Sequence, residues 1–576
     1  MTGFSAKQVA GGGNTRRNAA AVHWWAAGFK ILMVGGVSLG LLALWAVKLR
    51  DISADDFDFV VMNVNVSVVV PRRNRDFRNS FTREQQAAEM AGSERLPWIS
   101  ADLEANYSSR LLNSWLAPKD APCKISRTVD IRVPIVDGIE LSTSEIHDFV
   151  IQAVDDSGEP RCSGGDYFEI DLSGESWKSR PPVKDLGNGN YTVSLSVHPD
   201  FSGDYNLTII LLYRDFEGLK FSPSRFVFDR TLRVIPIKFA PLDPSPQLPE
   251  LKRCREADFA RDAWSGRWTR HARNDSCPIS GDGRFRCQEP SFPCSVPWCH
   301  GALGSLESNG WVYSAHCSFK LFTSEEAWNC LTDRWIFWWG DSNHCDTIRN
   351  VLHFILDVNH HIQKVPRIFD SNVTNPRNPA QVIRITSIFN GHHNATGNYE
   401  GLHSLSDAGY REFLRGYFSG DVVPDAVIMN SGLHDGVHWS TVRKFIAKGA
   451  DYAAGFWNEV VSGIRERGAA KRPPEIIYRT TVAGGGYARS LAFNPQKMEA
   501  FNGVVLDKLR RKGILDKVID GFDMTFPWHY DNRCNDGVHY GRPPSKTRWR
   551  DGGIGHQYFV DLMLGHAIIN ALCAAP

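Results

Sequence analysis

A serine after a strand-like run is the first group in this sequence that could do covalent chemistry. Gly340, Asp341 and Ser342 follow the apolar run WIFWW and precede a helix-like stretch, which places Ser342 on the turn between them. Open α/β sheets carry their active sites at the carboxyl ends of strands. Backbone N–H groups at a helix start stabilise negative charge that develops on an attacked carbonyl group. This position therefore suits acyl chemistry at Ser342.

A serine hydroxyl is a poor nucleophile near neutral pH unless a base takes its proton. Asp536 and His539, in RCNDGVHY, place a carboxylate three residues before an imidazole. On one loop, Asp536 would accept the Nδ1 proton and leave Nε2 facing Ser342. The pair follows FDMTF, which is predicted to be the last strand, and precedes the C-terminal helix. The same spacing occurs at three other pairs, which remain alternatives: Asp341/His344, Asp357/His360 and Asp435/His438.

The elements that would position these residues alternate from residue 333 onward. Strand-like runs are WIFWW, VIRITSIF, DAVIMNSG, EIIYRTTV and FDMTF. Helix-like segments are RNVLHFILDV, 441–468, 495–512 and YFVDLMLGHAIINAL. Such alternation is typical of a parallel sheet covered by helices. We therefore predict an α/β three-layer domain over residues 254–576.

A second folded unit is predicted ahead of this domain. Residues 122–238 contain short alternating apolar runs separated by turn signals, among them HDFVIQAVD, YTVSLSV and YNLTIILLY. This pattern predicts a β-sandwich. The Pro-rich sequence PLDPSPQLPE indicates a linker over 239–253.

Near the N-terminus, Ile31 to Val47 form an uncharged apolar run, which Trp24, Trp25 and Phe29 extend upstream past Lys30. The resulting length of about 20 residues is enough to cross a bilayer. Basic residues precede this run and acidic residues soon follow, which favours a cytosolic N-terminus and a type II orientation. We expect a cytosolic tail over 1–23, a transmembrane signal anchor over 24–47 and a stem over 48–121. A cleaved signal peptide is the alternative.

Composition excludes one class of partner and indicates a compartment. The 65 Lys and Arg residues nearly balance 64 Asp and Glu residues, so the chain lacks the basic excess that nucleic-acid binding requires. All 12 Cys lie after the apolar run, as expected for a domain in an oxidising compartment. Zinc binding is the alternative for the Cys-dense stretch from Cys254 to Cys330, but it lacks paired C-x2-C motifs, so disulfides are preferred and no metal site is expected.

Together, GDS near the domain start and DxxH near its end resemble the PC-esterase branch of the SGNH/GDSL hydrolase fold. The closest likeness is to the neurexophilin and PC-esterase (NXPE) family, and it covers about 250–576. CREADFARDAWSGRWTR (254–270) is similar to the first, Cys-containing segment of trichome-birefringence-like acetyltransferases. KDLGNGNYTVSLSVHPDFSGDYNLTIILLY (184–213) resembles a filamin-type immunoglobulin-like repeat. This domain order matches that of the NXPE family.

The resemblance implies roles for individual residues. Ser342 is the implied nucleophile, His539 the base and Asp536 its orienting carboxylate. Gly391, in IFNGHH, is the implied oxyanion donor. The Gly-x-Asn-Asp block of the superfamily corresponds to Gly432-Leu433-His434-Asp435, where His434 stands in place of Asn. Asn430 is the substitute candidate for that third donor.

The function expected from these observations is a two-step acyl transfer through an acyl-enzyme on Ser342. The resemblance favours a glycan O-acetyltransferase of the Golgi lumen, with acetyl-CoA or an acetyl ester as co-substrate and no bound cofactor. The expected partners are a carbohydrate acceptor, the bilayer through residues 24–47, and a protein bound by the filamin-like repeat. The alternatives are a carbohydrate acetylesterase or a non-catalytic adhesion or ligand protein, at the plasma membrane or secreted.

Overall fold

The structure is a computed structural model of the chain. It describes residues 111–112, 115, 126–135, 138–241, 251–270, 311–358, 365–391, 400–468, 472–531, 537–541 and 558–574. The chain divides into two units, Met1–Ala91 and Gly92–Pro576, and every described residue belongs to the second. The predicted tail and anchor, and all but three residues of the predicted stem, lie outside the described residues. Among the described helices, none has the length and apolar character that a membrane span requires.

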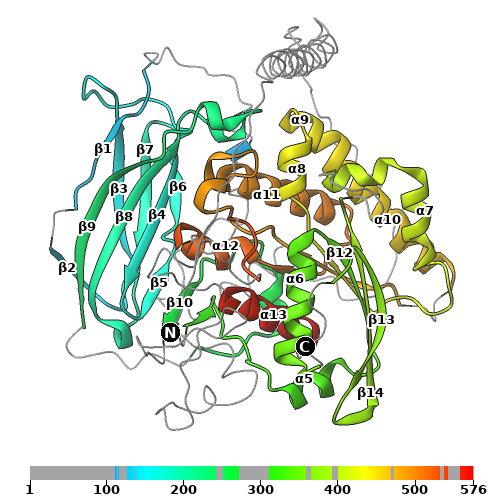
Figure 1. Ribbon diagram of the computed structural model, residues 1–576. Helices are drawn as coiled ribbons and strands as arrows, with labels where there is room; N and C mark the ends of the chain where they lie inside the picture. Colours follow the sequence, from blue (N-terminus) through cyan, green and yellow to red (C-terminus); the bar gives the residue numbers. More distant parts are fainter. Residues whose placement is uncertain are drawn as a thin grey trace, which may run out of the picture. The chain divides into compact units, whose positions relative to one another are not determined.

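Two β-sheets pack face to face in the first part of the described chain (Figure 1). The four-stranded sheet has the order β1 (Asp130–Arg132), β3 (His147–Val154), β7 (Asn190–Leu195), β6 (Val183–Asp185). The seven-stranded sheet has the order β11 (Trp311–Ser314), β10 (Arg267–Arg270), β5 (Trp177–Ser179), β4 (Tyr167–Gly174), β8 (Gly203–Tyr213), β9 (Arg230–Ala240), β2 (Ile139–Ser142). Along β7, buried and half-buried residues alternate, as a strand with one face on the core requires. For the predicted β-sandwich, a domain of mostly antiparallel β-sheet is therefore confirmed, with β2 and β9 as a parallel pair.

The seven-stranded sheet extends past the predicted linker. Strand β10 pairs antiparallel with β5, and β11 pairs antiparallel with β10. Both strands come from the sequence that was assigned to the α/β domain. That sequence thus completes the sheet of the sandwich, because β10 covers the edge that β5 would otherwise expose.

The second part of the described chain is an α/β domain with a six-stranded, mostly parallel sheet. Its order is β13 (Ile368–Asn375), β14 (Asn378–Phe389), β12 (Trp335–Gly340), β15 (Ala426–Met429), β16 (Glu475–Arg479), β17 (Lys517–Ile519), and only β13 is antiparallel to its neighbour. Strands β12, β15 and β17 are buried along their whole length, as is typical of parallel strands covered on both faces. The predicted α/β class is confirmed.

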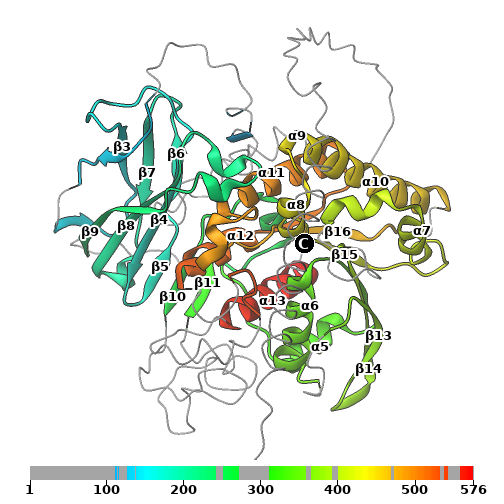
Figure 2. The same ribbon diagram turned by 45° about the horizontal axis from the view of Figure 1, so that its top comes forward.

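Helices cover both faces of this sheet. In Figures 1 and 2, α5 (Ser324–Leu331), α6 (Ser342–Asn350) and α13 (Tyr558–Cys573) lie together on one side. On the other side lie α7 (Ala408–Gly416), α10 (Asp451–Glu466) and α11 (Pro495–Arg511). The short helices α8 (Leu433–His438), α9 (Val442–Lys444) and α12 (Gly521–Thr525) follow strand ends or join longer helices.

The prediction that FDMTF forms the last strand was wrong, because its first four residues belong to α12 and Phe526 begins the following 3-10 helix. Asp520 caps this helix by accepting a hydrogen bond from the Asp523 N–H, and Thr525 Oγ1 donates to the Gly521 carbonyl. A short run that is buried on all sides has no alternation to separate strand from helix. The last strand is instead β17, three residues that directly precede this helix cap.

Two disulfides are described, Cys254–Cys317 and Cys330–Cys573. For these four cysteines the preference for disulfides over zinc is confirmed. The Asp258, His316 and Cys317 side chains lie close enough together to suggest a metal site. The Cys317 sulfur, however, is already bonded to Cys254 and cannot act as a thiolate ligand.

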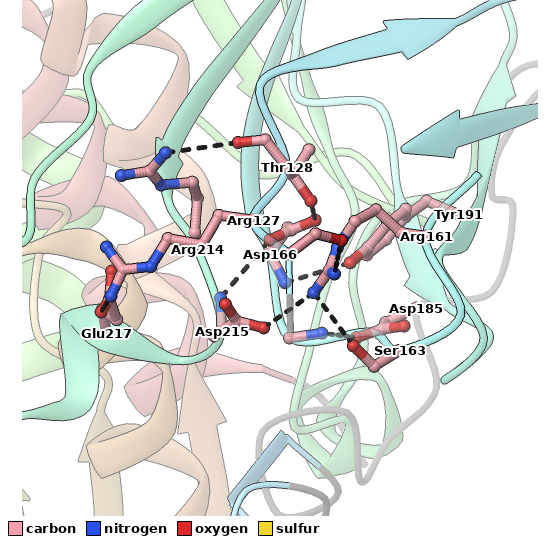
Figure 3. A network of polar contacts seen from close by, with 12 residues as sticks. Arg127, Thr128, Arg161, Ser163, Asp166, Asp185, Tyr191, Arg214, Asp215 and Glu217 are labelled. Atoms are coloured by element: carbon pink, nitrogen blue, oxygen red, sulfur yellow. Dashed lines mark hydrogen bonds and ion pairs between the residues drawn. The ribbon is translucent and has the colours of Figure 1, made fainter. Parts of the chain in front are cut away.

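A buried polar network lies at the start of β4 (Figure 3). Thr128 Oγ1 donates to the Asp166 carboxyl group at 2.5 Å, and the Asp215 N–H donates to its other oxygen at 3.4 Å. Arg161 pairs with the Asp215 carboxylate at 3.3 Å. Burial raises the pKa of Asp166 to about 7, and the hydrogen bond from Thr128 opposes the shift. The folded protein therefore binds a proton at Asp166 more tightly than the unfolded chain does.

Acidification is expected to stabilise the protein through this carboxyl group. A carboxyl group whose pKa is raised on folding favours the folded state most when it is protonated, and this contribution is lost as the pH rises towards 7. Between about pH 7.5 and about pH 5.5, Asp166 should add on the order of 1 to 2 kcal/mol to the free energy of unfolding. Urea unfolding at both pH values measures this effect. The free energy of unfolding should rise less on acidification in Asp166→Asn than in wild type. An equal gain in both proteins would contradict this assignment.

Candidate active site

Ser342 and His539, which are 197 residues apart in sequence, form a direct hydrogen bond. Ser342 Oγ and His539 Nε2 are 2.6 Å apart. Ser342 is half-buried and His539 is buried. A general base must lie within hydrogen-bond reach of the proton that it abstracts. This pair meets that condition.

The start of α6 positions Ser342. Asp341 is the N-cap, and its side chain accepts a hydrogen bond from the Asn343 N–H at 2.9 Å. Ser342 is the first helical residue, so its N–H group has no acceptor within the helix and lies at the positive end of the helix dipole. A Cβ atom at position 340 would lie 2.1 Å from His344 Nδ1. Since His344 is fully enclosed, the motif requires glycine at this position.

A short loop holds His539. The Gly485 N–H donates to the Gly537 carbonyl at 2.7 Å, and the Tyr540 hydroxyl donates to the Ala483 carbonyl at 2.8 Å. Gly537 has φ +91°, a conformation that favours glycine. Asp536, the predicted orienting carboxylate, lies outside the described residues.

Two of the three predicted oxyanion donors lie together. Gly391 follows the end of β14, and His434 lies in α8 after β15. A Cβ atom on Gly391 would be 3.0 Å from His434 Nδ1. Burial lowers the pKa of His434, the Asp341 carboxylate opposes the shift, and charge on His539 adds to it. Strands β14, β12 and β15 are parallel neighbours, so their carboxyl ends bring these residues to the edge that carries Ser342.

The third predicted donor, Asn430, is engaged within the sheet. Its side-chain Nδ2 donates to the Arg479 backbone carbonyl at 3.1 Å, and its backbone carbonyl accepts from Asn390 Nδ2 at 2.8 Å. Asn390, which sequence reasoning did not single out, also contacts Ser431 Oγ at 3.2 Å. These two asparagines join the ends of β14, β15 and β16. In this arrangement the Asn430 amide is already bonded to backbone.

Comparisons with known proteins give only distant matches. No family model matches the sequence, and no curated protein matches it. The Lin-41 filamin domain matches at 12% identity with a TM-score of 0.15, over 20% of this chain and 99% of the other. Est24, a carbohydrate acetylesterase from Sinorhizobium meliloti, matches at 11% identity with a TM-score of 0.21, over 41% of this chain and 97% of the other.

A third solved structure, domains 4 and 5 of the S-layer protein SbsC, matches at 14% identity with a TM-score of 0.14. That match covers 20% of this chain and about half, 52%, of the S-layer chain. At these scores the three likenesses decide neither the fold nor the activity of this chain.

The pair Asp341/His344 serves the structure around Ser342. Neither ring nitrogen of His344 has a hydrogen-bond partner among the described residues, and the ring packs edge-on against Trp338 at 5.2 Å. Burial holds the pKa of His344 well below its usual range, and the charge of Arg479 adds to this. His344 therefore remains neutral and packed in the core while Asp341 caps α6.

In the alternative pair Asp435/His438, the two side chains interact with other groups and not with each other. The Asp435 carboxylate accepts hydrogen bonds from the Leu402 N–H at 2.9 Å and from Trp439 Nε1 at 2.9 Å. Burial raises the pKa of Asp435 to about 6, and the Ser431 hydroxyl opposes the shift. His438 instead stacks on His403, with ring centroids 4.5 Å apart. Asp357 pairs with Arg377, and His360 lies outside the described residues.

A buried arginine that sequence reasoning missed lies beside Asp341, the N-cap of the helix that begins with Ser342. Arg479, at the end of β16, is fully buried, and its guanidinium group lies 3.7 Å from Asp341 Oδ1. Burial lowers the pKa of Arg479, and the Asp341 carboxylate opposes the shift most strongly. The guanidinium charge thus compensates the carboxylate that caps the Ser342 helix. The only sequence signal was a charged residue at the end of the apolar strand EIIYR.

Proposed function

We propose that this chain is an acyl-transferring enzyme in which Ser342 is the nucleophile and His539 the general base. The observation that carries the proposal is the 2.6 Å hydrogen bond between Ser342 Oγ and His539 Nε2 at the carboxyl edge of the sheet. A serine paired with an imidazole at a helix start has both an activated nucleophile and donors for an oxyanion.

In the first step, His539 Nε2 takes the Ser342 hydroxyl proton while Oγ attacks the carbonyl carbon of an acyl donor. The Ser342 and Gly391 N–H groups are the proposed donors to the tetrahedral oxyanion. The carbon–leaving-group bond then breaks, the leaving group receives the proton from His539, and an acyl-enzyme ester remains on Ser342. Asp536 is the proposed partner that stabilises the charged imidazole.

In the second step, His539 takes a proton from an acceptor hydroxyl, whose oxygen attacks the acyl-enzyme. Collapse releases the acylated acceptor, and Ser342 Oγ regains the proton from His539. A sugar hydroxyl as acceptor gives O-acetyl transfer to a glycan, and water gives ester hydrolysis. We propose an acetyl donor such as acetyl-CoA or an acetyl ester, and a carbohydrate acceptor in the lumen of the Golgi. The disulfides agree with an oxidising compartment, and residues 24–47 are the proposed membrane anchor.

The proposal is tested with the purified full-length chain and 4-nitrophenyl acetate as donor, with and without a mixed panel of glycans. Wild type should release 4-nitrophenol and transfer acetyl groups to at least one glycan, whereas Ser342→Ala should do neither. The ratio of glycan to water as acceptor distinguishes transferase from esterase. Equal activity of the two folded proteins would contradict a serine enzyme and would favour the binding-protein alternative.

A further inference from the structure

A buried ionic cluster joins the sandwich to the α/β domain. Glu169, in β4, contacts His529 Nε2 at 2.9 Å through one carboxylate oxygen. Its other oxygen contacts Arg489. The side chains of Glu169 and His529 are both 0% exposed. Although burial opposes ionisation, the charges of His529 and Arg489 lower the pKa of Glu169 to about 2.

Hydrogen bonds and ion pairs hold this cluster together, in addition to packing contacts. His529 Nδ1 faces the Phe526 carbonyl and Nε2 faces the Glu169 carboxylate. Both of these partner groups are hydrogen-bond acceptors. Arg489 also pairs at 3.0 Å with Asp229, whose side chain is 43% exposed, so two carboxylates contact this guanidinium group. Removing the charge of the buried Glu169 would leave Arg489 without its buried partner.

A single residue, Gly485, connects the cluster to the loop that holds His539. A Cβ atom on Gly485 would lie 2.2 Å from the His529 carbonyl oxygen, so the two backbones touch. On its other side, the Gly485 N–H donates to the Gly537 carbonyl at 2.7 Å. A Cβ atom on Gly537 would lie 2.4 Å from the Gly485 carbonyl oxygen. Gly485 is thus enclosed between the His529 turn and the His539 loop.

The same segment is held to the sandwich further along. Arg489 supplies the ion pair to Glu169, and its backbone carbonyl accepts a hydrogen bond from the Tyr213 hydroxyl at 3.2 Å. The sandwich therefore contacts His529, whose backbone touches Gly485, and Arg489, which follows Gly485 by four residues in sequence. A shift of either residue would act on Gly537 through Gly485.

We propose that Glu169 of the sandwich is a positioning residue for His539, so that the sandwich holds the catalytic base against Ser342. This inference rests on the proposed function. Glu169 contacts no reacting atom and acts through His529, Gly485 and Gly537. The sandwich is then part of the catalytic apparatus instead of a spacer ahead of it.

A second ion pair across the same interface supplies the matched control. Glu499, in α11, pairs with Arg180 at 2.9 Å and accepts a hydrogen bond from the Tyr167 hydroxyl at 3.0 Å. Both side chains of the pair are buried, at 9% and 8% exposure. Glu499 makes no described contact with Gly485 or with residues 537–541. Glu499→Gln therefore removes a comparable interface charge from a residue with no described contact to Glu169, His529, Gly485 or Gly537. Its partner Arg180 lies over the Phe526 ring, 4.2 Å from the ring centroid, so an effect on His529 through Arg180 would appear in this variant as well.

The test compares the full-length Glu169→Gln and Glu499→Gln variants with wild type and Ser342→Ala. Glu169→Gln should lower kcat for 4-nitrophenyl acetate about tenfold with little change in KM, because a misplaced base slows the chemical step. Hydrogen exchange of peptides covering 483–490 and 537–541 should become faster in Glu169→Gln. Both Glu→Gln variants should lower the unfolding temperature by similar amounts. Glu499→Gln, however, should leave kcat and the hydrogen exchange of these peptides as in wild type. If Glu169→Gln does not fold, Glu169→Asp, which keeps the charge on a shorter side chain, should show the same changes at smaller size.

The outcomes separate this inference from the proposed function. A wild type that is no more active than Ser342→Ala would overturn both. An active wild type whose kcat and exchange are unchanged by Glu169→Gln would overturn the positioning role alone. Equal losses of kcat in Glu169→Gln and Glu499→Gln would also overturn it, because domain docking in general would then explain the effect.

Discussion

Replacing His539 with alanine is expected to lower kcat/KM for an acetyl ester by about 10³-fold, within the range for loss of a general base. Ser342 Oγ would lose the acceptor that lies 2.6 Å away, and its proton would have to go to water. The fold should persist, since His539 lies on a short loop at the carboxyl edge of the sheet and is not part of the hydrophobic core. Initial rates with 4-nitrophenyl acetate and far-UV circular dichroism would measure both effects.

The control for this variant is His438→Gln. His438 belongs to a competing Asp-x-x-His pair, but it stacks on His403 and its nearby aspartate bonds to other groups. Its replacement should leave kcat/KM close to the wild-type value. A large loss in His438→Gln together with normal activity in His539→Ala would show that the wrong histidine had been assigned as the base.

Removing the Cys330–Cys573 disulfide is expected to cost about 2 to 5 kcal/mol of the free energy of unfolding. This bond closes 243 residues of sequence between the end of α5 and the end of α13. Helix α13 supports α6 directly, because Asp561 accepts hydrogen bonds from Thr347 at 2.7 Å and Asn350 at 2.6 Å. The double variant Cys330→Ala/Cys573→Ala should therefore lose activity at a lower temperature than wild type.

Urea unfolding and thermal inactivation, followed in parallel, would measure this effect. Replacing both cysteines leaves no unpaired thiol from this bond to react elsewhere. The matched comparison is Cys254→Ala/Cys317→Ala, which opens a shorter span of 63 residues and should cost less. An unchanged unfolding midpoint in the Cys330/Cys573 variant would contradict the supporting role given to α13.

The sequence predicted those parts of the fold whose signals are local. Strands β12, β14, β15 and β16 coincide with apolar runs, and α11 follows an Asn–Pro start that caps a helix. The run FDMTF gave the wrong element because five buried residues fit a helix as well as a strand. The pairing of β10 with β5 could not be predicted, since it joins residues about 90 positions apart and leaves no local pattern.

The same contrast between local and long-range signals holds for the candidate site. Ser342 and His539 were found through motif spacing and the order of elements, and the structure brings them together. Asn390, Arg479 and Glu169 were missed because each is a single polar residue in or beside an apolar strand, and only the folded neighbours reveal its partner. Asn430 resembled a donor in sequence, yet its amide joins two strands.

Ser342 should react as a serine nucleophile that His539 activates. Incubation of the full-length chain with a fluorophosphonate, followed by peptide mass spectrometry, identifies such a residue because the phosphonylated serine does not turn over. We expect a single modified peptide that contains Ser342, slower modification in His539→Ala and none in Ser342→Ala. An enzyme that hydrolyses acetyl esters while Ser342 stays unmodified, or that is modified at another residue, would contradict this expectation.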